Sequence, residues 1–77
     1  MVQTSQRASG RISVVQEERF RLITDDGRGL LLTLGNDAGI EPQDLRGYHA
    51  RGSKVMVEYT GEPNLESGLA VRIWEMD

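Results

Sequence analysis

Apolar and polar residues alternate along most of this chain with the two-residue period of half-buried β-strands. Five stretches follow this pattern: residues 10–16, 19–24, 30–34, 54–60 and 69–74. Residues 30–34 are apolar almost without interruption, which is typical of a strand covered on both faces. The stretches are separated by segments rich in Gly, Asp and Asn, the residues that favour turns. The pattern therefore predicts five strands.

The alternation also predicts which side chains point into a common core. In a strand, every second side chain lies on the same face. The residues expected to face inward are Ile12 and Val14, Phe20 and Leu22, Val55, Val57 and Tyr59, and Leu69, Val71 and Ile73. The residues between them, among them several arginines, are expected to face outward.

One helix is predicted between the third and fourth strands. Pro42 suits the first position of a helix, where its missing N–H costs nothing, and Asp44 suits the positive end of the helix dipole. Gly52 is a suitable left-handed stop. The helix would present Leu45 and Tyr48 to the core.

Length and composition limit the organisation to one small domain. The chain has 77 residues and no cysteine, so neither disulfides nor thiolate–metal sites can support its core. Residues 1–9 are polar and are predicted to form a flexible N-terminal tail, and residues 10–77 a single barrel domain. A closed barrel suits so short a chain because it leaves no unpaired strand to protect.

The charge and hydropathy of the chain bear on its partners and location. The formal net charge is −3, whereas a dedicated nucleic-acid binder usually has a basic balance. No apolar run approaches the roughly 20 residues of a membrane span, and no secretory signal pattern opens the chain. We therefore expect a soluble cytoplasmic protein with no membrane association.

The order of predicted elements, β-β-β-α-β-β, resembles the OB-fold, a small five-stranded barrel. The resemblance covers residues 10–74, including the helix from Pro42 to Arg51. That helix argues against an SH3-like barrel, the main alternative. The chain is also similar to small bacterial proteins of uncharacterised function, through Arg19 to Leu22, Asp25 to Arg28 and Gly61 to Asn64.

The OB resemblance implies a binding region on strands two and three, between the first and fourth inter-strand loops. OB-folds typically bind oligonucleotides or oligosaccharides there. In this chain the two loops are residues 16–18 and 61–68, and both carry acidic residues. The two strands contain one aromatic residue, Phe20, on the face assigned to the core. The chain thus departs from a typical nucleic-acid-binding OB-fold.

The candidate binding residues are cations, one tryptophan and one loop leucine. Arg19, Arg21, Arg72 and Trp74, with Lys54 nearby, are predicted to form one outward face. Arginine with an aromatic ring can bind single-stranded nucleic acid, and the same pair anchors many protein contacts. These residues also fit ordinary outward positions of half-buried strands. Leu65, in the long Pro63-containing loop, either inserts into a partner or folds back onto the barrel.

The remaining polar residues indicate no catalytic, metal or cofactor site. Asp25 and Asp26, like Asn36 and Asp37, have the composition of turns and do not match a calcium-binding loop. The only histidine, His49, lies near the end of the predicted helix without a recognisable nucleophile or metal motif. We therefore expect no catalysis by this chain.

Two functions remain open. The first is a non-catalytic binding or accessory module that mediates protein–protein contacts through Leu65, Trp74 and neighbouring arginines. The alternative is a protein that binds single-stranded nucleic acid through Arg19, Arg21, Arg72 and Trp74. The oligomeric state does not follow from the sequence.

Overall fold

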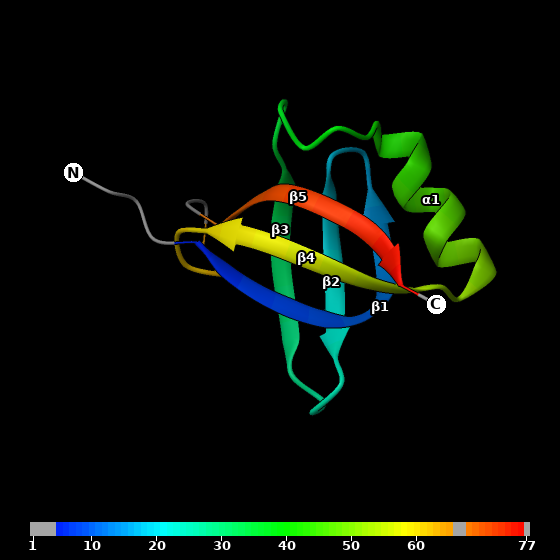
Figure 1. Cartoon of the computed structure of the whole chain (residues 1–77), viewed down its shortest axis with the longest axis horizontal. Helices are drawn as coiled ribbons and strands as arrows, with labels where there is room; N and C mark the ends of the chain where they lie inside the picture. Colours follow the sequence, from blue (N-terminus) through cyan, green and yellow to red (C-terminus); the bar gives the residue numbers. More distant parts are fainter. Residues whose placement is uncertain (1–4, 66–67, 77) are drawn as a thin grey trace.

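A computed structural model of the chain describes residues 5–65 and 68–76 and contains the five predicted strands and the helix (Figure 1). The elements are β1 (Gln6–Gln16), β2 (Arg19–Thr24), β3 (Gly29–Leu34), α1 (Pro42–Arg51), β4 (Lys54–Thr60) and β5 (Leu69–Met76). Their order confirms the predicted fold class, a mostly β chain with one short helix between the third and fourth strands.

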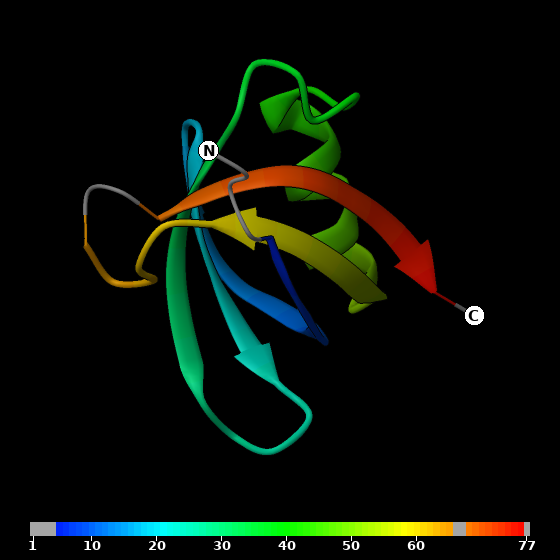
Figure 2. The ribbon, with the colours of Figure 1, turned by 60° about the vertical axis from the view of Figure 1, so that its left-hand side comes forward.

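The strands close into a barrel in the order β1-β2-β3-β5-β4, with β4 returning to pair with β1. All pairs are antiparallel except β3 and β5, which pair in parallel over two residues, Thr33 and Leu34. Figures 1 and 2 show the result as two crossed layers, β1-β4-β5 over β2-β3. This closed arrangement is consistent with an OB-like fold.

The inside of the barrel is filled by the apolar faces of all five strands, one helical leucine and Ala38 from the segment between β3 and α1. The buried hydrophobic residues are Ile12, Phe20, Leu22, Leu30, Leu32, Leu34, Ala38, Leu45, Val55, Val57, Tyr59, Ala70 and Ile73. The predicted inward faces of β2 and β4 are therefore confirmed. Each of these side chains is removed from water and contributes to the free energy of folding in proportion to its apolar area.

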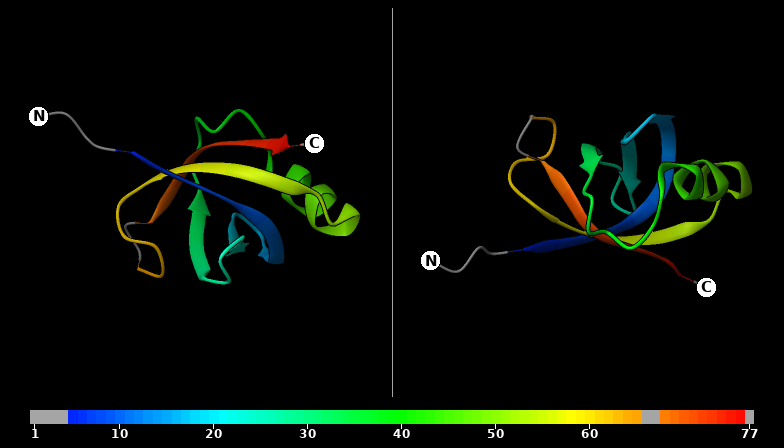
Figure 3. Two further views of the ribbon diagram at one scale, coloured as in Figure 1. Left: turned by 60° about the horizontal axis from the view of Figure 1, so that its bottom comes forward. Right: turned by 90° about the horizontal axis from the view of Figure 1, so that it is seen from above.

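The helix lies at one end of the barrel, away from the loop that joins β4 and β5 (Figure 3). Pro42 opens it, and the Asp44 carboxylate accepts a hydrogen bond of 2.8 Å from the Glu41 N–H. Gly52 ends it in the left-handed conformation, with φ 64°. Leu45 is fully buried, so the helix closes this end of the barrel as expected. No helix in the described part of the chain is long and apolar enough to cross a membrane.

A bulge in β1 overturns part of the predicted inward face of that strand. Ile12 pairs with Leu22 but Val14 pairs with Arg21, so Ser13 is an extra residue on β1. An extra residue shifts the alternation by one position and moves the following side chains to the other face. Val14 is therefore 47% exposed, and Val15 packs against the core in its place.

A second bulge has the same effect in β5. Glu58 pairs with Arg72 and Tyr59 with Ala70, which leaves Val71 without a partner on β4. Ala70 consequently points inward with Ile73, whereas Leu69 is 38% exposed and Val71 is half-buried. The predicted inward positions of Leu69 and Val71 are thus wrong.

Two further expectations are corrected at β1 and β3. Strand β1 begins at Gln6, so residues 6–9, assigned to a flexible tail, are strand residues that pair with β4; residues 1–4 of that tail lie outside the described residues. The barrel domain therefore starts before the predicted Gly10. Strand β3 is also not covered on both faces, because Leu31 is 39% exposed.

Gly10 lies where β1 passes from one layer to the other. It pairs with Thr24 of β2 and with Val55 of β4, and it is buried. A Cβ atom at this position would lie 2.0 Å from the carbonyl oxygen of Ile23. Only glycine lets the two backbones approach this closely.

Gly10→Ala is therefore expected to lower the free energy of unfolding by about 1–3 kcal/mol, the usual cost of overpacking. Urea unfolding followed by the fluorescence of Trp74, the single tryptophan, measures it. Gly29→Ala is the matched control, because its Cβ would meet only the flexible guanidinium end of Arg21. Equal urea midpoints for the two variants would contradict the close approach at Gly10.

Candidate functional site

The exposed large hydrophobic residues of the described chain gather on one side of the barrel. They are Val14, Leu31, Leu65 and Leu69, with exposures of 47%, 39%, 64% and 38%. They come from β1, β3, the β4–β5 loop and β5. Contiguous apolar side chains with polar neighbours are typical of interaction sites.

The strand register brings three of these residues and two arginines into adjacent rows. One row across the sheet runs from Val14 through Arg21 to Leu31. The next row runs from Arg19 through Thr33 to Leu69. The first row thus has an exposed arginine between two exposed apolar side chains, and the second has an exposed arginine that Thr33 separates from one exposed leucine.

The β4–β5 loop adds Leu65 to this region because Asn64 fastens the loop to β3. The Asn64 N–H donates to the Leu31 carbonyl at 2.9 Å, and the Asn64 side-chain oxygen accepts from the Leu31 N–H at 2.8 Å. Asn64 adopts φ 72°, which asparagine tolerates better than most residues. Of the two expectations for Leu65, its 64% exposure agrees with a side chain available to a partner. We call Val14, Arg19, Arg21, Leu31, Leu65 and Leu69 the β3 surface.

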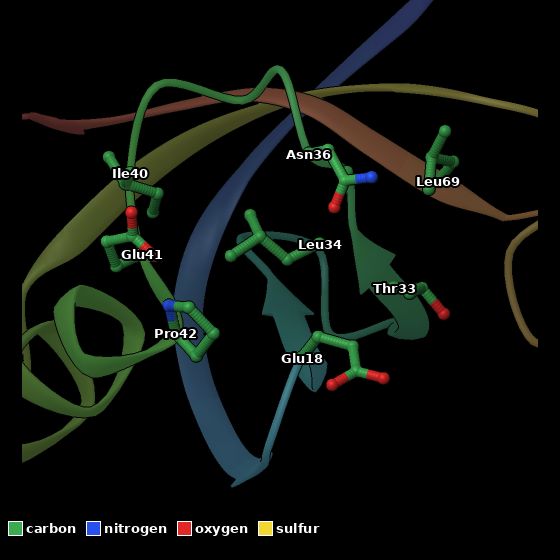
Figure 4. Close-up of a pocket in the computed structure, with 9 residues that line it drawn as sticks. Glu18, Thr33, Leu34, Asn36, Ile40, Glu41, Pro42 and Leu69 are labelled. Atoms are coloured by element: carbon green, nitrogen blue, oxygen red, sulfur yellow. The ribbon is translucent and has the colours of Figure 1, made fainter.

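A pocket of about 580 Å³ adjoins the β3 surface at the end of β3 nearest the helix (Figure 4). Leu69 belongs to both, and Thr33, which lies between Arg19 and Leu69 in the second row, also lines the pocket. Its other labelled walls come from the β1–β2 turn, the end of β3 and the segment that leads into α1: Glu18, Leu34, Asn36, Ile40, Glu41 and Pro42. The pocket extends the exposed apolar region toward the start of the helix. The sequence pattern does not predict this pocket because its walls come from segments far apart in the chain.

The single face predicted from Arg19, Arg21, Arg72, Trp74 and Lys54 is not formed. Arg19 and Arg21 lie on β2, whereas Lys54 is on β4 and both Arg72 and Trp74 are on β5. In the barrel order, β3 separates β2 from β5 and β1 separates β2 from β4. The cations therefore divide between two layers of the barrel.

Trp74 instead lies in a second cluster, on the outer side of the β1-β4-β5 layer. The guanidinium carbons of Arg72 and Arg7 lie 5.1 and 5.7 Å from the centroid of its ring. Both arginines also approach Glu58, each with a nitrogen 3.9 Å from one carboxylate oxygen. Arg7 was not among the predicted site residues because it lies in the segment that was expected to form a flexible tail. Residues 6–9 contain one apolar residue, Ala8, so the local sequence gave no signal of the pairing with β4 that extends β1 to Arg7.

The acidic β2–β3 turn is held by the barrel's own side chains. Asp25 accepts a hydrogen bond of 2.6 Å from the Ser9 hydroxyl and lies 3.2 Å from the Lys54 amine, and these contacts lower the pKa of Asp25. Hydrogen bonds from Thr24 and Arg28 likewise lower the pKa of Asp26. Within the described residues no group of three or more His, Cys, Asp or Glu side chains is arranged to hold a metal ion.

Comparison with protein-family models, with curated proteins and with solved structures finds no match to this chain. The architecture supports the OB-like part of the resemblance stated above. The similarity to small bacterial proteins stays a prediction.

The Asp25 contacts predict a stability that depends on pH. Because folding lowers the pKa of Asp25, the stabilisation is fully present above the unfolded-state pKa of about 3.9 and is lost as the pH falls through the folded-state value. Asp25→Asn should therefore lower the urea midpoint at neutral pH. The difference from the unsubstituted protein should shrink below about pH 4.

Asp37→Asn is the control for this measurement, because it removes an equal charge from an exposed loop position without breaking an ion pair among the described residues. A difference between Asp25→Asn and the unsubstituted protein that persists unchanged in acid would contradict the role given to the Asp25 carboxylate.

Proposed function

We propose that this chain is a non-catalytic binding or accessory module that binds a protein partner through the β3 surface. A cytoplasmic location and a bacterial source are parts of the same proposal, and the cysteine-free composition agrees with a reducing compartment. The chain would contribute a rigid barrel that presents side chains, and the partner would supply any chemistry.

The observation that carries the proposal is the gathering of the exposed large hydrophobic residues. In the described residues Leu31 lies on β3, Leu69 on the neighbouring strand and Leu65 on the loop bound to β3, whereas Val14 lies one strand further, in the same row as Leu31 with Arg21 between them. Isolated exposed leucines are common on protein surfaces, but a contiguous group exposes apolar area that a partner can bury. Burial of this group against a partner would stabilise the complex in proportion to the apolar area removed from water.

The two arginines of the β3 surface support a protein partner with acidic side chains near its apolar ones. Arg19 and Arg21 are exposed, and each guanidinium can donate two parallel hydrogen bonds to one carboxylate. Arg21 folds over Gly29, whose missing side chain leaves room for the guanidinium. Arginine beside apolar residues is a common composition of protein-contact sites.

Single-stranded nucleic acid, the alternative partner, has less support on this surface. Binding of bases needs aromatic rings on which they stack. The only aromatic residue of β2 and β3 is Phe20, which is 1% exposed and belongs to the core. The ring of Trp74 lies on the other layer, so the predicted combination of Arg19 and Arg21 with Trp74 has no geometric basis.

Truncation of the two most prominent leucines tests the proposal. The tagged protein should co-purify from its native cells with one dominant protein partner. The Leu31→Ser/Leu65→Ser variant should bind the purified partner at least about tenfold more weakly, as expected when central apolar contacts are removed. Calorimetry with the purified partner measures the affinity.

Ala50→Ser, at an exposed position of α1, is the matched control and should bind as the unsubstituted protein does. Urea unfolding should show that both variants remain folded, because substitutions at exposed sites usually change stability by less than about 0.5 kcal/mol. Co-purification of RNA or DNA in place of a protein, or an unchanged affinity of the double variant, would contradict the proposal.

A further inference from the structure

The outer side of the β1-β4-β5 layer carries an ordered pattern of charge that the β3 surface does not include. Three cross-strand rows follow one another: Arg7, Glu58 and Arg72; then Ser9, Met56 and Trp74; then Arg11, Lys54 and Met76. We call these nine residues the Trp74 surface. Its first and third rows each contain two cations, and the middle row contains none.

In each basic row the cations outnumber the nearby carboxylates by one. In the first row Glu58 faces both Arg7 and Arg72. In the third row Asp25, from the β2–β3 turn, forms an ion pair with Lys54 and also attracts Arg11, so one carboxylate faces two cations; Arg11 donates to the Gly52 carbonyl at 3.2 Å. This surface is therefore locally basic on a chain whose formal net charge is −3.

The arginines of the first row, Arg7 and Arg72, lie against the Trp74 ring but form only weak interactions. Their side chains are 59% and 65% exposed, and within the described residues neither guanidinium donates a hydrogen bond. Exposed ion pairs and exposed cation–π contacts of this kind contribute little to stability. An incoming carboxylate could therefore recruit either guanidinium at little cost, while the Trp74 ring keeps both near the same place.

We propose that the Trp74 surface is a second binding surface, for an extended acidic segment of a protein partner. Successive rows are two residues apart along each strand, so the two basic rows lie about 13 Å apart. In an extended peptide, side chains four residues apart lie on one face at the same spacing, with the side chain two residues along between them. The segment that fits therefore has acidic residues at positions i and i+4 and an apolar residue at position i+2.

The charge balance favours a protein segment over a nucleic acid. Each basic row has one surplus positive charge, so together the two rows suit a ligand with two separated carboxylates. A nucleic-acid strand would instead place a continuous run of phosphates near Glu58 and Asp25. The Trp74 ring is contacted by two guanidiniums, so a base would have to displace them in order to stack. Met56 beside Trp74 offers an apolar contact for the middle side chain of the peptide.

This inference goes beyond the proposed function, because the Trp74 surface lies on a different layer from the β3 surface and would bind independently of it. The test uses a synthetic peptide with glutamate, leucine and glutamate at alternate positions, separated and flanked by threonine and serine. Two comparison ligands are the same peptide with lysine in place of glutamate and a short oligothymidylate. Trp74 fluorescence and the side-chain NMR signals of Trp74, Arg7 and Arg72 report binding at low ionic strength.

The glutamate peptide is expected to shift these signals and to bind at least about tenfold more tightly than the lysine peptide. Arg7→Gln/Arg72→Gln should weaken its binding by at least about fivefold, and Arg46→Gln, which removes an exposed cation from α1, should not. Leu31→Ser/Leu65→Ser should also leave it unchanged, which separates this result from the test of the β3 surface. Rising salt should weaken binding, which gives a readout that needs no variant.

Three results with the unsubstituted protein would overturn the inference: equal binding of the lysine peptide, tighter binding of the oligothymidylate than of the glutamate peptide, or no shift of the Trp74 and arginine signals at saturating peptide. An affinity that Arg7→Gln/Arg72→Gln leaves intact would do so as well.

Discussion

Closure of the barrel depends on the passage of β1 between two layers at Gly10. The N-terminal half of β1 pairs with β4, its C-terminal half pairs with β2, and at Gly10 both partners are bound at once. The backbone of Ile23 lies so close there that a side chain would have no room. Without this approach β1 could belong to one layer only, and the two layers would not enclose Phe20, Leu22 and Val57 in a common core.

The two bulges determine what the outside of the barrel presents. An extra residue in β1 and another in β5 turn Val14 and Leu69 away from the core and bring Val15 and Ala70 toward it. Half of the exposed large hydrophobic residues in the described chain owe their exposure to these irregularities. The bulges therefore both fit the strands to a small closed barrel and supply apolar side chains to the β3 surface.

Local signals predicted the elements, and the three-dimensional arrangement explains what they could not predict. The helix start at Pro42, its end at Gly52 and the inward faces of β2 and β4 follow from spacing and turn chemistry, which are local. The bulges depend on how β1 and β5 fit their neighbours, so alternation alone placed Val14 and Leu69 inside. The grouping of the candidate site failed for a similar reason: Arg21 and Trp74 both face outward, but strand order places them on different layers. Arg7 was missed because pairing with β4, not local sequence, extends β1 to it.

Asn64 has a further consequence for the behaviour of the protein in concentrated solution. Strands β3 and β5 pair over only two residues, which would leave the first half of β3 with unpaired backbone groups along an open edge. Such an edge is a template for sheet extension between molecules, and the neighbouring Leu31 and Leu65 would favour aggregation. By occupying both backbone groups of Leu31, Asn64 closes this edge without a strand. The chain can therefore expose apolar side chains beside β3 while the backbone groups of Leu31 are not free to pair with a second copy.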